Sequence, residues 1–148
     1  SMVVPAIGNA APIRFRVGAL GNTRDLWVSP QHRMLLQGWQ MELLFEQNEV
    51  LATAKSLIND HSICRVEGGD VEYYHILFDS HQIIFAEGTP CESFHPGVQA
   101  LDTLGDATRQ EVLTLFPELS LGTDWDKQTA RLCLKSYESK VAAFALAI

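Results

Sequence analysis

The sequence predicts a mainly β domain followed by a C-terminal α-helical extension, and three observations lead to this fold class. Up to residue 95, apolar residues come in short runs interrupted by turn residues such as Gly, Pro and Asn. After His95-Pro96-Gly97 the apolar spacing changes to three and four residues, which is typical of helices. The 148 residues suit one domain with a substantial core. We therefore expect a flexible leader at 1–12, a β region at 13–95, and a helical extension at 96–148 packed on the same domain.

Short strands are predicted in the first third of the chain, after the leader. Residues 13–17 alternate apolar and basic side chains with period two, and glycines close the segment. Three further apolar runs follow in the same manner, at 26–28, 34–36 and 41–45. By contrast, residues 50–58 have helical spacing and predict a brief helix that ends at Asn59-Asp60.

Further strands are predicted in the middle of the chain. Segments 62–67 and 71–78 are separated by Gly68-Gly69-Asp70, which favours a hairpin. Both faces of 71–78 are largely apolar, so we expect this strand to be central and buried. Residues 83–86 form the next strand, between two turns.

The C-terminal part is predicted to be helical. Residues 98–104 have the spacing of a short helix, and Asp106 is an N-cap candidate for a second one that stops at Pro117. A longer helix is expected from Trp125 onward. Its apolar stripe, which we expect to pack in the core, consists of Leu134, Tyr137, Val141, Phe144 and Ile148.

Composition excludes several classes of partner. The net charge is −7 and no Lys/Arg cluster occurs, which argues against nucleic acid and anionic membranes. No apolar run approaches the ~20 residues that cross a bilayer, and the start lacks the basic region of a signal peptide. The three cysteines are odd in number and far apart, so we expect neither disulfides nor a structural zinc site, and no cofactor. Cytoplasmic and exported locations both stay open.

The strongest candidates for chemistry are Ser29 and His32, a hydroxyl and an imidazole three residues apart on a proline-stiffened bend. An imidazole titrates near neutral pH and can shuttle a proton, although a structural turn histidine is the alternative. His81 lies at another turn, and a His pair with Asp79 could bind zinc. No nucleophile elbow, zinc-protease helix or phosphate-binding loop occurs. Cys91 follows a turn, but the sequence puts no base beside it.

Two blocks carry a resemblance to a known family. Ser29-Pro30-Gln31-His32 resembles a T-x-x-H block with Ser for Thr, and 71–88 resembles a later block of strand, His and strand. Their order resembles the Hint domain, the Hedgehog/intein autoprocessing module, over roughly residues 12 to 140. Three shorter segments add to the resemblance, and one of them, 51–57, lies between the two blocks. The other two, 18–21 and 94–97, resemble a bacterial branch of the family that has a helical C-terminal extension.

The resemblance implies a β horseshoe that cleaves its own backbone. In that family the T-x-x-H histidine acts on the peptide bond before an N-terminal Cys or Ser and promotes an N-to-S or N-to-O acyl shift. This role would fall to His32, with Ser29 hydrogen-bonded around the scissile carbonyl. His81 matches the later block's histidine, which assists acyl chemistry. The substrate would be the chain's own upstream segment.

Two departures from the family pattern limit this expectation. No block like Cys-Phe-x-x-Gly-Thr precedes residue 12, and Glu92-Ser93-Phe94 stands where inteins end in His-Asn. We therefore expect an incomplete horseshoe, truncated and inactive alone, which is autoproteolytic only if its parent carries the nucleophile block. A homodimer could cover the exposed strand edges. The alternatives are a degenerate Hint scaffold that acts as a structural or interaction module of a larger bacterial protein, and a small metal-dependent hydrolase.

Overall fold

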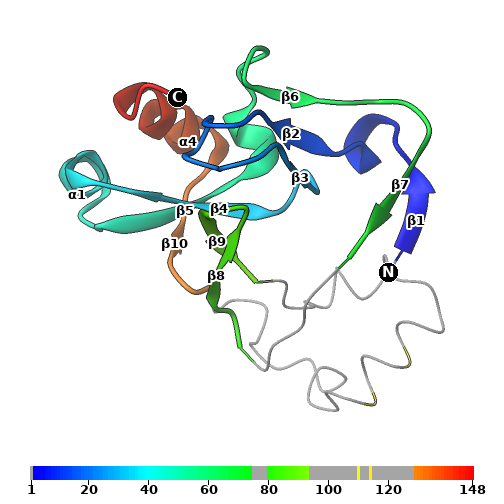
Figure 1. Ribbon diagram of the computed structural model, residues 1–148. Coiled ribbons are helices and arrows are strands. Elements are labelled where there is room, and N and C mark those ends of the chain that lie inside the picture. The colour runs from blue at the N-terminus through cyan, green and yellow to red at the C-terminus, as the bar shows by residue number, and fades with distance from the viewer. Residues whose placement is uncertain (1, 75–79, 94–109, 111–113, 115–128) are drawn as a thin grey trace.

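The protein is mainly β with a C-terminal helix, as the sequence predicts (Figure 1). The computed structural model describes residues 2–74, 80–93, 110, 114 and 129–148. This part of the chain contains ten strands, which form three sheets of two, three and five strands and do not close into a barrel. The predicted helices at 98–104 and from Asp106 to Pro117 lie outside the described residues.

The five-stranded sheet is the centre of the molecule. Its order is β10-β5-β4-β9-β8, and only the β10–β5 pair is parallel. Its strands are β4 Arg33–Gln37, β5 Glu49–Thr53, β8 Ile83–Ala86, β9 Thr89–Glu92 and β10 Leu132–Cys133. β4 and β5 each bury three consecutive residues, as strands covered on both faces do.

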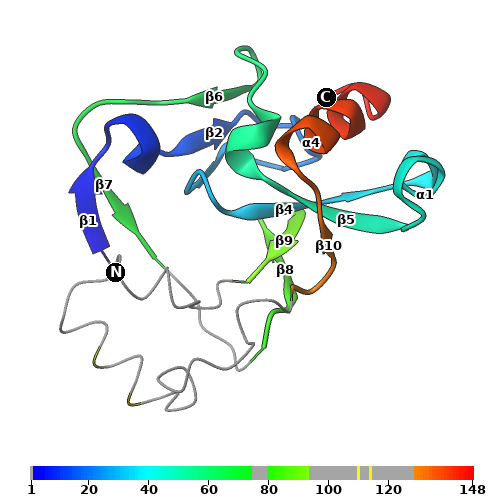
Figure 2. The ribbon, with the colours of Figure 1, turned by 180° about the vertical axis from the view of Figure 1, so that it is seen from behind.

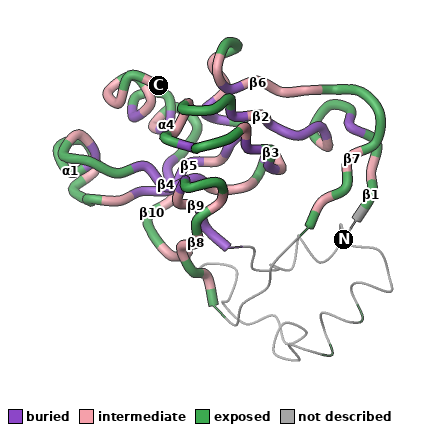
Figure 3. Tube along the Cα trace, in the orientation of Figure 1, coloured by how far each residue is buried: buried purple, intermediate pink, exposed green. Residues whose placement is uncertain are grey.

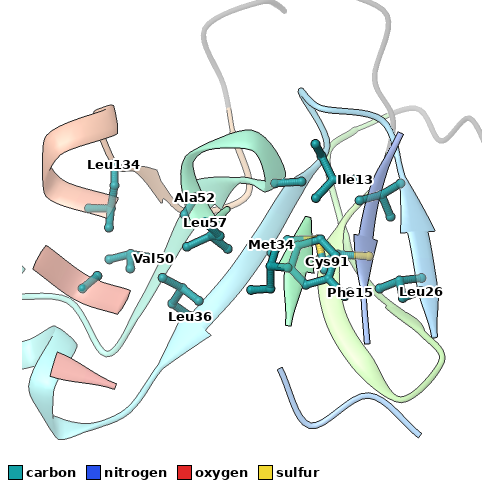
Figure 4. Close-up of a cluster of buried hydrophobic side chains, with 14 of the residues drawn as sticks. Ile13, Phe15, Leu26, Met34, Leu36, Val50, Ala52, Leu57, Cys91 and Leu134 are labelled. Carbon is teal, nitrogen blue, oxygen red and sulfur yellow. The ribbon is translucent and has the colours of Figure 1, made fainter. Parts of the chain in front are cut away.

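The three-stranded sheet packs its apolar face against this centre. It has the order β3-β2-β6, with β2 Ile13–Phe15, β3 Leu26–Val28 and β6 Ile63–Arg65. The side chains of β2 alternate between buried and half-exposed, which fits the predicted period of two. Figure 4 shows the resulting core, where Phe15 lies close to Met34 and Cys91 of the central sheet.

The N-terminal segment differs from the expected flexible leader. Met2–Pro5 forms β1, which pairs antiparallel with β7, Asp70–Tyr73, and Gly8–Ala10 is a 3-10 helix, η1. β1 and β7 form an arm beside the main body, and little of it is buried (Figure 3). The partners are more than sixty residues apart in sequence, so a short-range pattern does not reveal the pairing.

Two predictions about β7 were wrong. The Gly68-Gly69-Asp70 segment does not make a hairpin, because β6 pairs with β2 whereas β7 pairs with β1. β7 is also not a central buried strand, because its side chains alternate between exposed and half-buried in a two-stranded sheet. The apolar character of both faces of 71–78 therefore does not reflect burial at 71–73.

The periods predicted for two further segments were also wrong. The strand-like run at 41–45 is part of helix α1, Trp39–Phe45, which exposes Leu43 and buries Met41. The expected helix at 50–58 is strand β5 followed by a 3-10 helix, η2, Ala54–Leu57. Most of β5 and η2 is buried, and a run that is apolar all round shows no clear period by which strand and helix can be told apart.

The C-terminal helix is shorter than predicted. Within the described residues α4 spans Ser136–Ala145 and follows β10, and neither α4 nor any other described helix is long and apolar enough to cross a membrane. Ser139 and Ala142 form its buried face, whereas Tyr137, Val141 and Phe144 are exposed, Phe144 by 89%. Of the stripe expected in the core, only Leu134 is fully buried and Ile148 is half-buried.

A buried asparagine organises the loop after β2. The Asn22 amide nitrogen donates to the carbonyl oxygens of Phe15, Arg16 and Arg24 at 3.2, 3.0 and 2.6 Å. Its side-chain oxygen accepts the backbone N–H of Leu20 at 3.0 Å. A single side chain thus hydrogen-bonds four backbone groups of the loop and of the strand before it.

The same loop holds the β8–β9 hairpin. The hairpin turns at Glu87 and Gly88, both with positive φ (49° and 83°), as in a two-residue type I′ turn. The backbone N–H of Thr23 donates to the Glu87 carbonyl at 2.9 Å, and the buried Thr89 hydroxyl donates to the Leu20 carbonyl at 3.2 Å. The loop after β2 therefore fixes where β8 and β9 lie on the central sheet.

Replacing Asn22 should destabilise the whole domain. Asn22→Ala removes four hydrogen bonds to backbone groups, and we expect the free energy of unfolding to fall by about 2–3 kcal/mol. Asn48→Ala, at an exposed side chain, is the matched control and should change little. Urea denaturation measures both. A loss below about 0.5 kcal/mol for Asn22→Ala would contradict the role of this side chain.

Replacing Ser139 should have the opposite effect. Its hydroxyl lies on the buried face of α4 and has no hydrogen-bond partner among the described residues. Ser139→Ala removes a desolvated polar atom without adding volume, so unfolding should become costlier by about 1 kcal/mol. The exposed Ser136→Ala serves as the control on the same helix. A less stable Ser139→Ala protein in thermal unfolding would show that the hydroxyl is satisfied.

Candidate functional site

The predicted Ser29-Pro30-Gln31-His32 bend is a hydrogen-bonded turn between β3 and β4. The His32 N–H donates to the Ser29 carbonyl at 3.0 Å, so the two residues are the ends of a four-residue β-turn. Pro30 at its second position restricts φ to the value that such turns need. Ser29 and His32 are both half-buried, and the Nε2 atom of His32 is shielded from solvent.

The 3-10 helix η2 fixes this turn from one side. The backbone N–H of Ala54 donates to the His32 carbonyl at 2.8 Å, and that of Lys55 donates to the Pro30 carbonyl at 3.0 Å. These bonds continue the antiparallel pairing of β4 with β5 beyond the end of β5. The backbone that carries the imidazole is therefore held by η2 at two positions of the turn, Pro30 and His32.

A buried carboxylate lies next to the turn, at the end of β9. The side chain of Glu92 is only 3% exposed. Its Oε2 accepts a hydrogen bond from Arg33 at 3.0 Å, and its Oε1 accepts the backbone N–H of Ala130 at 2.8 Å. The Nδ1 atom of His81 lies 3.3 Å from Oε1, an ion pair when the imidazole is protonated. Arg33 supplies the opposite charge that a buried carboxylate requires.

Strand register brings His32 toward the same place. β4 and β9 are antiparallel neighbours, and Arg33 meets Glu92 across them. Continued by one residue, this register sets His32 opposite Ser93. Ser93 is buried and is the last described residue before the gap that begins at residue 94.

The β8 strand brings His81 to this end of the sheet. Gln82 pairs with Ser93 through two hydrogen bonds, from the Gln82 N–H to the Ser93 hydroxyl at 2.9 Å and from the Ser93 N–H to the Gln82 carbonyl at 2.7 Å. His81 precedes Gln82, and its side chain is 10% exposed. The two candidate imidazoles, 49 positions apart in sequence, thus come from different strands to one end of the central sheet.

The arrangement suits proton transfer at a peptide bond. One imidazole stands on a rigid turn with a hydroxyl three residues away, and the other is oriented by a carboxylate. Imidazoles held in this way act as general acids and bases near neutral pH. The roles of Ser29, His32 and His81 in catalysis remain predictions.

Sequence reasoning missed Arg33, Glu92 and Ala130. A lone acidic residue directly after the buried Cys91 was a signal for a paired charge, because unpaired charges are rarely buried. The partners themselves were not predictable, since Arg33 and Ala130 lie 59 and 38 residues away from Glu92.

The other candidates for chemistry are less suited to it. Cys91 is fully buried, and burial raises the pKa of its thiol to about 11, so it is a poor nucleophile at neutral pH. His61 is exposed, as expected of a loop histidine. Asp79 of the zinc alternative lies outside the described residues. No group of three or more metal-ligating side chains gathers within the described ranges.

Comparison with known proteins gives one match. The family model described as the Hint domain matches residues 2–98, which covers the turn, the β8–β9 hairpin and the arm of β1 and β7. Residues 129–148, which carry β10 and α4, lie beyond the matched region. Neither a curated protein nor a solved structure is significantly similar to this chain.

The thiols should divide into two classes. Cys64 and Cys133 are half-buried and should react with a disulfide reagent such as DTNB at pH 8 in the native protein. Cys91 should react only after unfolding, because its thiol is protonated at that pH and inaccessible. Titration before and after adding guanidinium counts the two classes. Rapid reaction of all three in the native state would contradict the burial of Cys91.

Proposed function

Since this chain belongs to the Hint domain family, we propose that it is the peptide-bond-activating part of an autoprocessing domain. The observation that carries the proposal is the Ser29–His32 turn, whose two hydrogen bonds from η2 fix the backbone that carries the imidazole. A fixed proton donor is what general acid catalysis of amide cleavage needs. The substrate is the chain's own upstream segment, and we place the nucleophilic Cys or Ser there.

The proposed reaction is an acyl shift. The upstream thiolate or alkoxide attacks the carbonyl carbon of the preceding residue, and a tetrahedral oxyanion forms. The C–N bond then breaks, and His32 gives a proton to the departing amine, which leaves a thioester or ester. The Ser29 hydroxyl donates to the oxyanion. His81, oriented by Glu92, assists attack on the new ester by an external thiol or by water.

This proposal implies that the chain is inactive without its upstream block. A degenerate scaffold with a structural or interaction role is the other candidate, and it fits the same family match. Its exposed strand edges, such as β8 with Phe85 and β3 with Trp27, would then be covered by a second copy or by a partner strand. The residue that begins the upstream block in the full gene product distinguishes these functions.

His32 should be essential for cleavage. In the full gene product, His32→Ala should slow thiol-induced cleavage by about 10²-fold or more, the usual contribution of a general acid. His61→Ala, at the exposed loop histidine, is the control and should cleave at the wild-type rate. Gel analysis of the fragments over time measures both, and circular dichroism checks the fold.

Two outcomes would overturn the assignment. Unchanged cleavage of His32→Ala would remove this residue from the mechanism. A wild-type gene product without Cys or Ser at the first block, and without cleavage, would establish the scaffold function instead.

A further inference from the structure

The last described segment, 129–148, completes the site although it lies outside the family match. Its strand β10 lies parallel to β5, and the Leu134 N–H donates to the Leu51 carbonyl at 2.8 Å. Arg131 forms an ion pair with Glu49, the first residue of β5, at 2.6 Å. Figure 2 shows this segment running from the β8 end of the central sheet up to α4. The segment thus begins beside Glu92, to which Ala130 is hydrogen-bonded, and continues along β5 at one edge of the sheet.

One hydrogen bond joins this segment directly to the site. Oε1 of Glu92 accepts the Ala130 N–H at 2.8 Å and also faces Nδ1 of His81 at 3.3 Å. A carboxylate that is 3% exposed cannot replace a lost donor with bulk water. Loss of the Ala130 N–H should thus move the carboxylate, and with it the imidazole.

A second contact supports His32 from the same segment. α4 packs on η2, and η2 donates the two hydrogen bonds that fix the Ser29–His32 turn. The face of α4 that is buried contains Ser139 and Ala142. Residues 129–148 therefore contact the supports of both imidazoles, Glu92 beside His81 and η2 beside His32.

We infer that Glu92 is a positioning residue that makes the C-terminal segment part of the autoprocessing site. Its carboxylate is held in place by the Ala130 N–H, and it in turn holds the imidazole of His81. Undocking of residues 129–148 then slows the acyl chemistry although no catalytic group is changed. The inference rests on the proposed function for the role of His81 and adds a structural requirement to it.

The test uses three variants of the 148-residue chain, two at Ala130 and one at Glu92. Ala130→Pro removes the N–H that Glu92 accepts, whereas Ala130→Gly keeps it and is the matched control. Glu92→Gln retains the size of the side chain and removes its charge. The readouts are the His81 ring signals in long-range ¹H–¹⁵N spectra and the rate of His81 modification by diethyl pyrocarbonate, determined by peptide mass analysis.

We expect the His81 ring signals to shift in Ala130→Pro and in Glu92→Gln but not in Ala130→Gly. The rate of His81 modification should rise about tenfold in Ala130→Pro and in Glu92→Gln. A tenfold change in rate corresponds to the free energy of one hydrogen bond to a charged group. Exposed His61 should react equally in all variants. Unchanged His81 signals and rates in both Ala130→Pro and Glu92→Gln would overturn the inference.

Cleavage of the full gene product separates this inference from the proposed function. Ala130→Pro should slow thiol-induced cleavage about tenfold, and Ala130→Gly should not. If His81 responds as expected while His32→Ala still cleaves normally, the proposed function fails and the link between Ala130 and His81 stands. If cleavage needs His32 but Ala130→Pro cleaves at the wild-type rate, the positioning role of Glu92 is wrong.

Discussion

The buried carboxylate of Glu92 is the constraint on which the arrangement of the site depends. A charge that is 3% exposed is tolerated only when strong donors surround it. The groups around it come from β4, from His81 in the turn ahead of β8 and from the segment before β10, three parts of the chain that are distant in sequence. Satisfying one side chain thus fixes the relative positions of three elements at one end of the central sheet.

Local turn chemistry supplies the rest of the framework. Pro30 and the hydrogen bond between Ser29 and His32 define one turn, and Glu87 with Gly88 defines another. Asn22 connects the three-stranded sheet to the five-stranded sheet indirectly, because the loop that it organises holds the β8–β9 hairpin. The hairpin in turn carries Glu92. Short-range turns and one long-range charge therefore cooperate to place the imidazoles.

The sequence predicted strands correctly where turn residues flank a short apolar run, and it predicted the other elements less well. β2, β3, β4 and β8 follow from their apolar runs, and the fold class and family follow from their order. β5 was assigned the wrong period, because burial of the whole strand removes the alternation that distinguishes a strand from a helix. α1 was assigned to a strand because its apolar run includes Leu43 and Leu44, which the helix exposes. At the site the turn of Ser29 and His32 was visible, whereas the ion pair of Arg33 with Glu92 exists only through strand pairing. The catalytic roles stay predictions.

Intact-mass measurement of the full gene product, with and without an external thiol, tests the central claim most directly. The account predicts that thiol releases two fragments whose masses place the cut immediately before a Cys or Ser upstream of residue 2, with the thiol attached to the end of the upstream fragment. A single unchanged mass after prolonged incubation with thiol, in a product that contains such a Cys or Ser, would contradict it.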